Sequence, residues 1–591
     1  MKKILSLLVA LMLFGFTGCA DRQGSVTLTL TDYGAVTDHP EEDNTPALLS
    51  ALKDAKAAID AGKDVVLQLP EGQLHLYTDQ MPTHQIYISN HDHVDRRPVA
   101  FMLDGYKNLT IQGSDTHLLF HGRLIPFVIQ NSSNVKLEGF SIDNFRPAMT
   151  QIDILEIDES KDEVLVKLLD ETVYRIDDNR KLIVEGEDFE INVYTCLAFG
   201  ADEHMKWGRS DPLFNPKAIE VVDDHRLLLK GWQEIKHLEV GDHYALRSYY
   251  RPTPAIVIAD AADTEIQNVD VHYAEGMGLV AQNSTNITLN NFTVSRRERS
   301  PRRFTTVADA THFSGCRGVI DSTEGLYENM ADDAINVHGT YLRVDSIIAP
   351  DQLMVSFAHG QTFGISWYET GDSLALISRE TLLPVARFMP TQVEVLSPKN
   401  LKITVDGTLA AIEGETQDLL AVENLTAHPE VYFANNTVRN NRARGALFST
   451  PKRVDCLDNL FDHTHGCAIL LTGDANGWYE SGPCEEVLIK GNRFINALTG
   501  LYQFTDGIIS VNPQIARMEE GQYFHGSVIV ENNEFDTFPT PLVYAKSLRA
   551  LTFKDNVINT NNDYPSHFKD NNPQLINVGT VTGTLPTYTE E

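Results

Sequence analysis

The stretch Ile266–Val271 (IQNVDV) recurs 23 residues later as Leu289–Val294 (LNNFTV). The same spacing separates Phe433–Val438 (FANNTV) from Cys456–Phe461 (CLDNLF), and Ile529–Phe535 (IVENNEF) recurs at about the same distance as LTFKDNV. Each copy is a short strand of alternating apolar and polar residues followed by Asn or Gly, which is a turn signal. Fixed self-similarity with one short strand per unit is typical of a solenoid.

The length of the repeat selects the kind of solenoid. Helical hairpin repeats and propeller blades need about 33 residues or more, which this unit does not have. We therefore predict an all-β protein built on a right-handed parallel β-helix. Asn repeated at one turn can stack and hydrogen-bond along the axis. We interpret the Asn of several N-x-S/T sequons as such turn and ladder residues rather than as glycan sites, namely Asn283, Asn286, Asn291 and Asn424.

Two long stretches interrupt the repeat, 149–250 and 340–415. Both contain short segments in which apolar and polar residues alternate with a period of two, separated by turn signals. This pattern predicts two small antiparallel β-barrel domains inserted between coils. The remaining segments are then 25–148 for an N-terminal cap and the first coils, 251–339 for the middle coils and 416–591 for the C-terminal coils.

A helix is expected at the start of the folded chain. Pro46 would occupy its first turn, with Asn44 or Thr45 as the cap. This entry resembles that of many pectate-lyase-like β-helices. Such a helix covers the open end of a solenoid, where unpaired strand edges would otherwise be exposed.

The N-terminal residues 1–19 have the pattern of an export signal. Lys2 and Lys3 precede the apolar run Ile4–Phe16, which is too short for a stable transmembrane helix. The following FTGC resembles a bacterial lipobox, so we expect Cys19 to be lipidated and to become the first mature residue. The protein would then be an exported, membrane-anchored lipoprotein, in the periplasm or at the cell surface. Ordinary signal cleavage nearby is the alternative.

Composition narrows the choice of partners. The 591 residues carry a net charge of −34 with a pI near 4.9, which argues against nucleic acid or an anionic membrane surface as a partner. It also disfavours a polyanionic substrate. The cysteines beyond Cys19 show no paired metal-ligand spacing, so we expect no metal or other cofactor. Among them only Cys467 and Cys484 suggest a disulfide.

The candidate catalytic residues are three aspartates. Asp332 and Asp333 stand between apolar residues in NMADDAINVHG, and Asp309 in VADATH precedes them by 23 or 24 residues. Because this is one repeat, and neighbouring coils stack about 4.8 Å apart, Asp309 should lie beside the pair, with a register uncertain by one residue. Close carboxylates repel, which raises one pKa and supplies a general acid next to a general base, as glycosidic bond cleavage needs. The alternative is a solvated ladder of turn aspartates.

The segment NMADDAINVHG, the preceding ADATHF and Gly473–Gly482 (GDANGWYESG) together resemble glycoside hydrolase family 110. These are bacterial α-1,3-galactosidases that remove terminal galactose, including that of the blood group B determinant. The resemblance covers the mature chain with its insertions. It implies an exo-acting, inverting, metal-independent reaction. It also implies Asp332 as general acid, with Asp309 and Asp333 holding the attacking water. This assignment of roles also rests on similarity to polygalacturonases. The acid and base roles can be exchanged.

The candidates for substrate binding are Trp478, Asp474, Glu480, Glu275, His312 and His338. An aromatic face against the apolar face of a sugar, with carboxylates for its hydroxyls, would form a clamp around Trp478. The two histidines follow the catalytic acids and would bind hydroxyls or tune a pKa. A loop-anchoring Trp and core histidines are the plainer interpretations.

Two other functions remain open from the sequence. One is a polygalacturonase-like β-helix hydrolase that uses the same three-aspartate arrangement. The other is a non-catalytic, glycan-binding solenoid. The second insertion starts directly after the coil of Asp332, so it would either wall the site or act as a stability or dimerisation module, which makes a homodimer one possible assembly.

Overall fold

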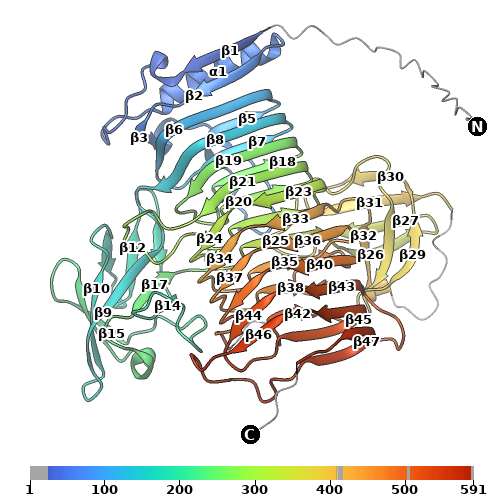
Figure 1. Cartoon of the computed structure of the whole chain (residues 1–591). Helices are drawn as coiled ribbons and strands as arrows, with labels where there is room; N and C mark the ends of the chain where they lie inside the picture. The colour runs from blue at the N-terminus through green and yellow to red at the C-terminus, as the bar shows by residue number, and fades with distance from the viewer. Residues whose placement is uncertain (1–23, 408, 410–416, 502–505, 587–591) are drawn as a thin grey trace, which may run out of the picture.

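The computed structural model describes residues 24–407, 409, 417–501 and 506–586. The predicted signal segment with Cys19 lies outside these residues. The described chain forms a column of stacked coils, with one domain projecting from each of two sides (Figure 1). Strands at equivalent positions of successive coils pair in parallel and form three ladders, which is the predicted parallel β-helix.

The first ladder runs the length of the column. Its strands are β1 (Ser25–Thr29), β2 (Asp64–Gln68), β6 (Lys107–His121), β8 (Ser133–Asn144), β19 (Ala262–Val271), β21 (Thr285–Val294), β23 (Arg317–Thr323), β33 (Glu430–Ala434), β36 (Arg453–Leu457), β40 (Glu486–Lys490), β43 (His525–Glu531), β45 (Val543–Lys554) and β47 (Gln574–Gly583).

The second ladder continues from the long strands of the first. It contains β3 (Gly72–Tyr77), the later halves of β6, β8, β19 and β21, and then β24 (Leu326–Glu328), β34 (Thr437–Arg439), β37 (Leu460–Asp462), β41 (Arg493–Ile495), β44 (Glu534–Thr537) and β46 (Val557–Thr560).

The third ladder carries the candidate site. Its strands are β5 (Arg97–Asp104), β7 (Ile125–Gln130), β18 (Ile256–Ala259), β20 (Leu279–Gln282), β22 (Thr311–Ser314), β25 (Ile335–Thr340), β35 (Ala446–Phe448), β38 (Ile469–Leu471), β42 (Ile509–Val511) and the first residues of β45 and β47.

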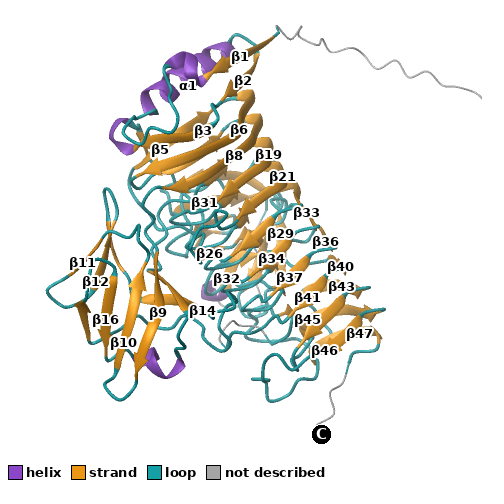
Figure 2. Ribbon diagram, turned by 60° about the vertical axis from the view of Figure 1, so that its left-hand side comes forward, coloured by secondary structure: helices purple, strands orange, loops and turns teal. Residues whose placement is uncertain are grey.

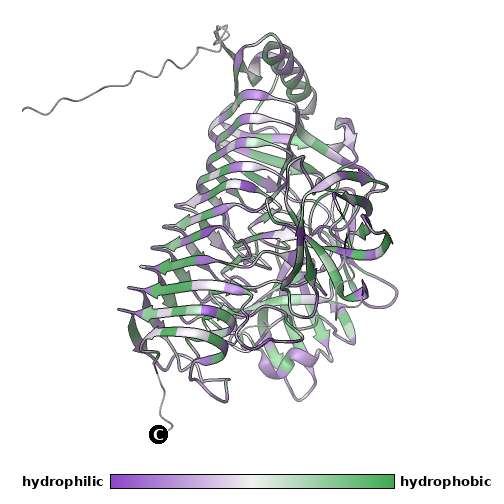
Figure 3. Ribbon diagram, turned by 90° about the vertical axis from the view of Figure 1, so that its right-hand side faces the viewer, coloured by the Kyte–Doolittle hydropathy of each residue, from purple (hydrophilic) through white to green (hydrophobic). Residues whose placement is uncertain are grey.

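The core lies inside the coils and is continuous along the axis. Alternate strand residues point inward, and equivalent aromatic side chains stack from coil to coil. Phe461, Phe494 and Phe535 form one such stack, with ring centroids 5.3 and 4.8 Å apart. The turns at the left-hand edge of the column are hydrophilic, while the strands contain long hydrophobic stretches (Figure 3). Inside the column, each coil therefore buries its apolar residues against the coils next to it.

Asparagines form the predicted ladder at one turn. The side-chain amides of Asn459, Asn492 and Asn533 each donate to the side-chain oxygen of the equivalent Asn on the next coil, at 2.9–3.1 Å. These amides satisfy one another inside a turn that would otherwise leave buried polar groups unpaired. At the surface, the sequon residues Asn286 and Asn291 donate across 23 residues to Asp263 and Asn268, respectively.

The expected helix is α1 (Thr45–Asp60), with Pro46 in its first turn. It packs against the first coils and covers their end (Figure 2). The side chain of Asn44 makes no cap hydrogen bond; instead a carboxylate oxygen of Asp43 accepts from the Thr45 N–H at 2.8 Å. Short 3-10 helices occur at Leu30–Tyr33, Thr78–Gln80, Gln233–His237 and Gln417–Leu419.

The first inserted domain lies between β8 and β18 and is antiparallel throughout. A six-stranded sheet has the order β14 (Thr195–Phe199), β17 (His243–Arg247), β9 (Thr150–Asp158), β10 (Glu163–Leu168), β16 (Arg226–Lys230), β15 (Ala218–Val221). A smaller sheet contains β11 (Tyr174–Ile176), β12 (Leu182–Glu185) and β13 (Glu190–Asn192).

The second inserted domain lies between β25 and β33. Its seven-stranded antiparallel sheet has the order β29 (Pro384–Phe388), β28 (Leu374–Ser378), β32 (Leu420–Asn424), β26 (Leu342–Ala349), β27 (Gln352–Ser356), β31 (Asn400–Val405), β30 (Pro390–Val395). The domain extends past the predicted end at 415, because β32 pairs with both β26 and β28. The sequence alone does not distinguish β32 from a coil strand, since LAVEN is apolar and short.

Cys467 and Cys484 are both buried, and the structure forms no disulfide between them. Among the described helices, none has the length and apolarity that crossing a membrane requires.

Candidate functional site

The third ladder brings the catalytic candidates together. Ile335 of β25 pairs with Thr311 of β22, so Asp309 and Asp333, each two residues before its strand, occupy equivalent positions on neighbouring coils. The register is thus the 24-residue step. One carboxylate oxygen from each of Asp309, Asp332 and Asp333 lies within 4.8 Å of the other two. This is closer than the separation of about 6.5–9.5 Å that is typical of an inverting pair of carboxylates.

The same position on the following coil is occupied by Arg444, because Ile335 also pairs with Ala446 of β35. Its backbone N–H donates to Asp333 Oδ1 at 2.9 Å, and its guanidinium donates to Asp333 Oδ2 at 2.7 Å. Burial raises the pKa of Asp333, and the positive charge of Arg444 counters part of that rise. Two charge-assisted hydrogen bonds from one residue hold this carboxylate in a fixed orientation.

Arg444 was not predicted from the sequence, because it follows Asp333 by 111 positions and the second insertion lies between them. The sequence nevertheless contains a pattern that indicates Arg444. When the insertion is removed, NNRARGALF aligns with NMADDAINV, and Arg444 falls on Asp333. A coil comparison that skips insertions finds it.

Asp309 lies at one end of a buried chain of hydrogen bonds. Its Oδ2 is 2.7 Å from His312 Nδ1, and His312 Nε2 is 2.8 Å from His338 Nε2. His338 Nδ1 lies 2.6 Å from the carbonyl oxygen of Gly339, which only accepts, so this nitrogen carries a proton. Burial lowers the pKa of both histidines to about 4, so both rings are neutral near pH 7.

These contacts favour one direction of the chain, although Glu480 Oε1 also lies 3.5 Å from His338 Nε2. A neutral His338 that is protonated at Nδ1 accepts at Nε2, so His312 donates from Nε2 and accepts at Nδ1. The proton between His312 and Asp309 then belongs to Asp309. Burial, together with the charge of Asp332, raises the pKa of Asp309 well above its ordinary value, in the same direction. The arrangement therefore favours a protonated Asp309 beside an Asp333 whose charge Arg444 stabilises.

Asp332 is the most accessible of the three acids. Its side chain is 24% exposed, against 4% for Asp309 and 1% for Asp333. Its Oδ2 lies 4.0 Å from Arg251 Nη1, and its Oδ1 has no hydrogen-bond partner among the described residues. Arg444 Nη1 lies 3.9 Å from Oδ1, so two guanidinium groups flank this carboxyl group, and its Oδ1 is left for a bound molecule to contact.

The walls of the cavity come from distant parts of the chain. Asn90, in the loop between β4 (Thr83–His84) and β5, accepts from Thr362 Oγ1 of the second insertion at 2.7 Å and donates to Glu480 Oε1 at 3.1 Å. Glu480 lies in β39 (Glu480–Ser481), which pairs antiparallel with the end of β25. The complete lining consists of Asn90, Arg251, Met277, Asp309, His312, Asp332, Asp333, Asn336, Arg444, Trp478 and Glu480.

The Trp478 loop is held by Asp474. The carboxylate of Asp474 accepts from the backbone N–H groups of Asn476, Gly477 and Trp478 at 2.7–3.1 Å. Trp478 remains 45% exposed, with the guanidinium of Arg251 5.3 Å from its ring centroid. The His359 ring centroid also lies 4.4 Å from that of Trp478. The loop therefore presents a partly exposed aromatic ring at the mouth of the cavity, where a sugar ring could pack.

The structure separates the predicted site residues into two groups. Asp309, Asp332, Asp333, His312, Trp478 and Glu480 line the cavity, and His338 contacts His312 behind it. Asp474 shapes the loop and is not part of the lining. Glu275 is also outside the lining, because its carboxylate is engaged by Arg123 in two hydrogen bonds of 2.5 and 2.6 Å. Arg251, Asn90, Met277, Asn336 and Arg444 were not predicted.

The sequences of related proteins align with nearly the whole chain. An α-1,3-galactosidase B from Phocaeicola vulgatus is 41% identical over 558 residues, which cover 92% of this chain and 91% of that protein. An α-1,3-galactosidase A from Bacteroides fragilis is 30% identical over 577 residues, covering 96% and 92%. This chain belongs to glycoside hydrolase family 110. The family model of the GLAA-B beta-barrel domain II also matches residues 352–417, within the second insertion.

Solved structures resemble this family member more distantly. The A-module of mannuronan C-5 epimerase AlgE4 from Azotobacter vinelandii is 10% identical with a TM-score of 0.38, covering 95% of this chain and 99% of that one. A family 28 exopolygalacturonase from Yersinia enterocolitica is 10% identical with a TM-score of 0.34, covering 94% and 78%.

The state of Asp309 predicts how stability depends on pH. A carboxyl whose pKa is raised in the folded protein costs stability above its unfolded pKa of about 3.9, and the cost grows as the pH rises toward the folded pKa. Asp309→Asn removes that cost. The variant should match the wild type near pH 4 and exceed it at pH 7–8, by about 1.4 kcal/mol for each unit of the shift.

Urea denaturation at several pH values measures this difference. Asp555→Asn, on an exposed turn, is the matched control and should show no such trend. Equal or lower stability of Asp309→Asn at pH 8 would contradict a protonated Asp309.

Proposed function

We propose that the protein is an exo-acting α-1,3-galactosidase that removes terminal α-1,3-linked galactose from glycans, including the blood group B determinant, with inversion at the anomeric carbon. The single observation that carries the hydrolytic part is the three-carboxylate cluster on neighbouring coils, beside Arg444. The linkage and sugar come from the names of relatives that cover about nine tenths of the chain.

Exo action is supported by the shape of the site. An open groove along a solenoid would admit the middle of a polymer. Here the Asn90 loop and Thr362 of the second insertion meet over the outer face of the third ladder, and the Trp478 loop stands at the mouth. A pocket of this kind favours a chain end, in which one terminal sugar enters and the rest extends outward past Trp478.

The roles follow from burial and hydrogen bonding. Asp332, the accessible carboxyl, would donate a proton to the leaving oxygen. Asp333, whose charged form Arg444 stabilises, would act as the base that takes a proton from water. Asp309, protonated and held by His312, would orient that water with its other oxygen. In the alternative assignment, Asp309 donates the proton and Asp332 orients the water. The pH dependence of the activity of the single variants distinguishes the two assignments.

Two features of the cluster bear on stereochemistry and favour opposite outcomes. By separation alone, carboxylate oxygens within 4.8 Å favour retention over inversion. Retention, however, needs an ionised carboxylate that is free to attack carbon. Asp333 is held at both oxygens by Arg444, and Asp309 is hydrogen-bonded to His312. Neither is free, and the third acid, Asp332, is assigned as the proton donor, so these roles support attack by water and therefore inversion.

Replacement of single acids tests the assignment. Asp332→Asn and Asp333→Asn should each lower kcat for release of galactose from an α-1,3-linked trisaccharide by at least about 100-fold, because each removes a proton-transfer group. Free galactose is assayed directly, and circular dichroism reports the fold. Asp321→Asn, on the same coil but in the first ladder, is the control and should retain wild-type activity. Near-normal activity in either of the first two variants would refute the assignment.

We also propose that Cys19 is lipidated and anchors the exported protein to a membrane. The support is the short apolar run followed by FTGC. Mass spectrometry of protein from membranes should find a mature chain that begins with acylated Cys19, and Cys19→Ala should move the activity to the soluble fraction. An unmodified Cys19 in the mature wild-type protein would exclude this proposal.

A further inference from the structure

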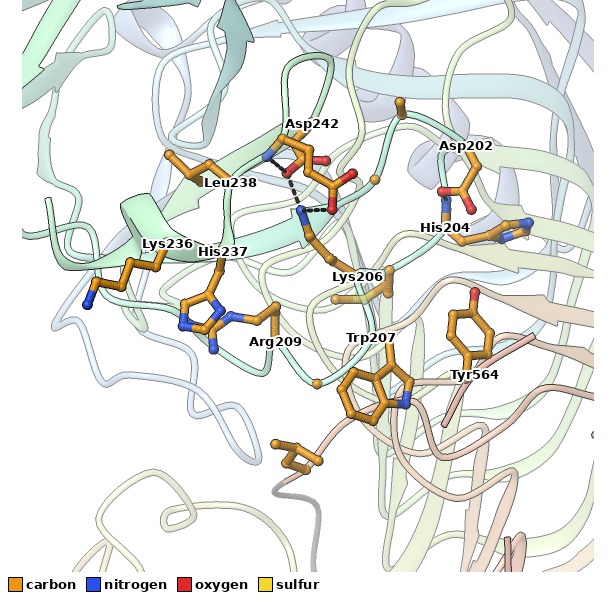
Figure 4. A pocket seen from close by; sticks show the side chains of 16 residues that line it. Asp202, His204, Lys206, Trp207, Arg209, Lys236, His237, Leu238, Asp242 and Tyr564 are labelled. Atoms are coloured by element: carbon orange, nitrogen blue, oxygen red, sulfur yellow. Dashed lines mark hydrogen bonds and ion pairs between the residues drawn. The ribbon is translucent and has the colours of Figure 1, made fainter. Parts of the chain in front are cut away.

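A second cavity, of about 790 Å³, lies between the first inserted domain and the C-terminal coils (Figure 4). The inserted domain contributes residues 200–202, 204–209 and 236–239 together with Asp242. Leu501 and Tyr564 come from the C-terminal part of the column. None of the residues discussed for the aspartate cluster lines this cavity.

The cavity occupies the same corner of the column as the aspartates. The segment between β14 and β15 crosses the turns that precede the third ladder. Asp211 accepts from Arg442 Nε at 2.8 Å, Ser210 Oγ lies 3.0 Å from His465 Nε2, and the Gly208 N–H donates to the Thr499 oxygen at 2.7 Å. These three partners belong to the first, second and third coils after that of Asp333. At about 4.8 Å per coil, Thr499 lies about 14 Å from Asp333 along the axis.

The lining combines aromatic rings with polar groups. Trp207 and Tyr564, both half-buried, line the cavity together with Lys236, His237 and Arg209 (Figure 4). Burial raises the pKa of Tyr564 to about 12, so its hydroxyl stays protonated and can donate a hydrogen bond. A partly exposed aromatic ring beside hydrogen-bonding groups is an environment that suits the apolar face and the hydroxyls of a sugar.

The charges of the lining largely cancel. Lys206 is paired with Asp242 and lies 3.5 Å from Glu239. Arg209 Nε donates to Glu234 at 2.8 Å. Because Lys206 and Arg209 have carboxylate partners, Lys236 is left as a single cation, and the described lining residues offer no cluster of free positive charge to a phosphate or sulfate. It therefore fits a neutral sugar better than an anionic group.

We propose that this cavity is an accessory carbohydrate-binding site, which holds a neutral sugar unit of the glycan chain whose terminal residue enters the aspartate pocket. The identity of that chain rests on the proposed function, whereas binding of sugar in this cavity does not. Occupation of both sites by one chain, or by neighbouring branches, would raise the effective concentration of chain ends at the aspartates.

Two variants test the proposal, Trp207→Ala and Tyr564→Ala, with Tyr432→Ala as the control. Tyr432 is also a partly exposed aromatic residue, but it lies in the first ladder. The probe for binding is a long neutral glycan chain without terminal α-galactose, titrated into the whole protein by calorimetry. Loss of one ring should weaken binding by about three- to tenfold, and the control should bind as the wild type does.

Kinetics provide the second measurement. For a long glycan ending in α-1,3-galactose, kcat/KM should fall by the same factor in both variants, while kcat/KM for the short trisaccharide should not change. Thermal denaturation reports the fold, and Trp207→Phe, which keeps a ring, should restore most of the loss. If Trp207→Ala does not fold, Tyr564→Ala still decides, because Tyr564 lies outside the inserted domain.

The proposal is overturned if both variants bind the long chain as tightly as the wild type, or if their kcat/KM falls equally on short and long substrates. Failure of the proposed function would look different. The wild type would then release no galactose, while the loss of glycan binding in Trp207→Ala would remain measurable.

Discussion

The parallel pairing of β22, β25 and β35 is the constraint on which the site depends. Residues that lie two positions before paired strands occupy equivalent places on neighbouring coils. Asp309, Asp333 and Arg444 therefore stack one above another. Two buried acids at this distance would repel strongly in a region of low dielectric. Arg444 neutralises one of them, and the chain through His312 and His338 favours the protonated form of the other. The remaining acid, Asp332, stays accessible to a bound molecule.

The rest of the molecule converts this stack into a pocket. The β-helix alone would present the aspartates on an open flank. The second insertion supplies Thr362, the N-terminal coils supply Asn90, and the loop after β38 supplies Trp478 and Glu480. Asp474, although it does not face the cavity, holds that loop in shape by accepting three backbone N–H groups in a row. Residues that are hundreds of positions apart in the sequence thus come together because the coils stack in this register.

The sequence predicts those features that repeat or have a local cause. The 23-residue period predicted the β-helix, the spacing from Asp309 to Asp333 predicted the cluster, and Pro46 marked the capping helix. Features that depend on pairing across an insertion were missed. Arg444 is one, and β32, which joins the inserted sheet after a loop, is another. Glu275 and Asp474 have the right chemistry for a sugar site, but Arg123 and the loop backbone engage them. Sequence alone does not reveal such partners.

On the proposed roles of the three acids, water and not an aspartate attacks the anomeric carbon. Proton NMR of the first-formed galactose, followed during cleavage of an α-1,3-linked substrate, tests it most directly. Attack by water held between Asp309 and Asp333 predicts that β-galactose appears first and then mutarotates. Initial formation of α-galactose would mean retention and a covalent intermediate, and would contradict the roles that the contacts of Arg444 and His312 indicate for the three acids.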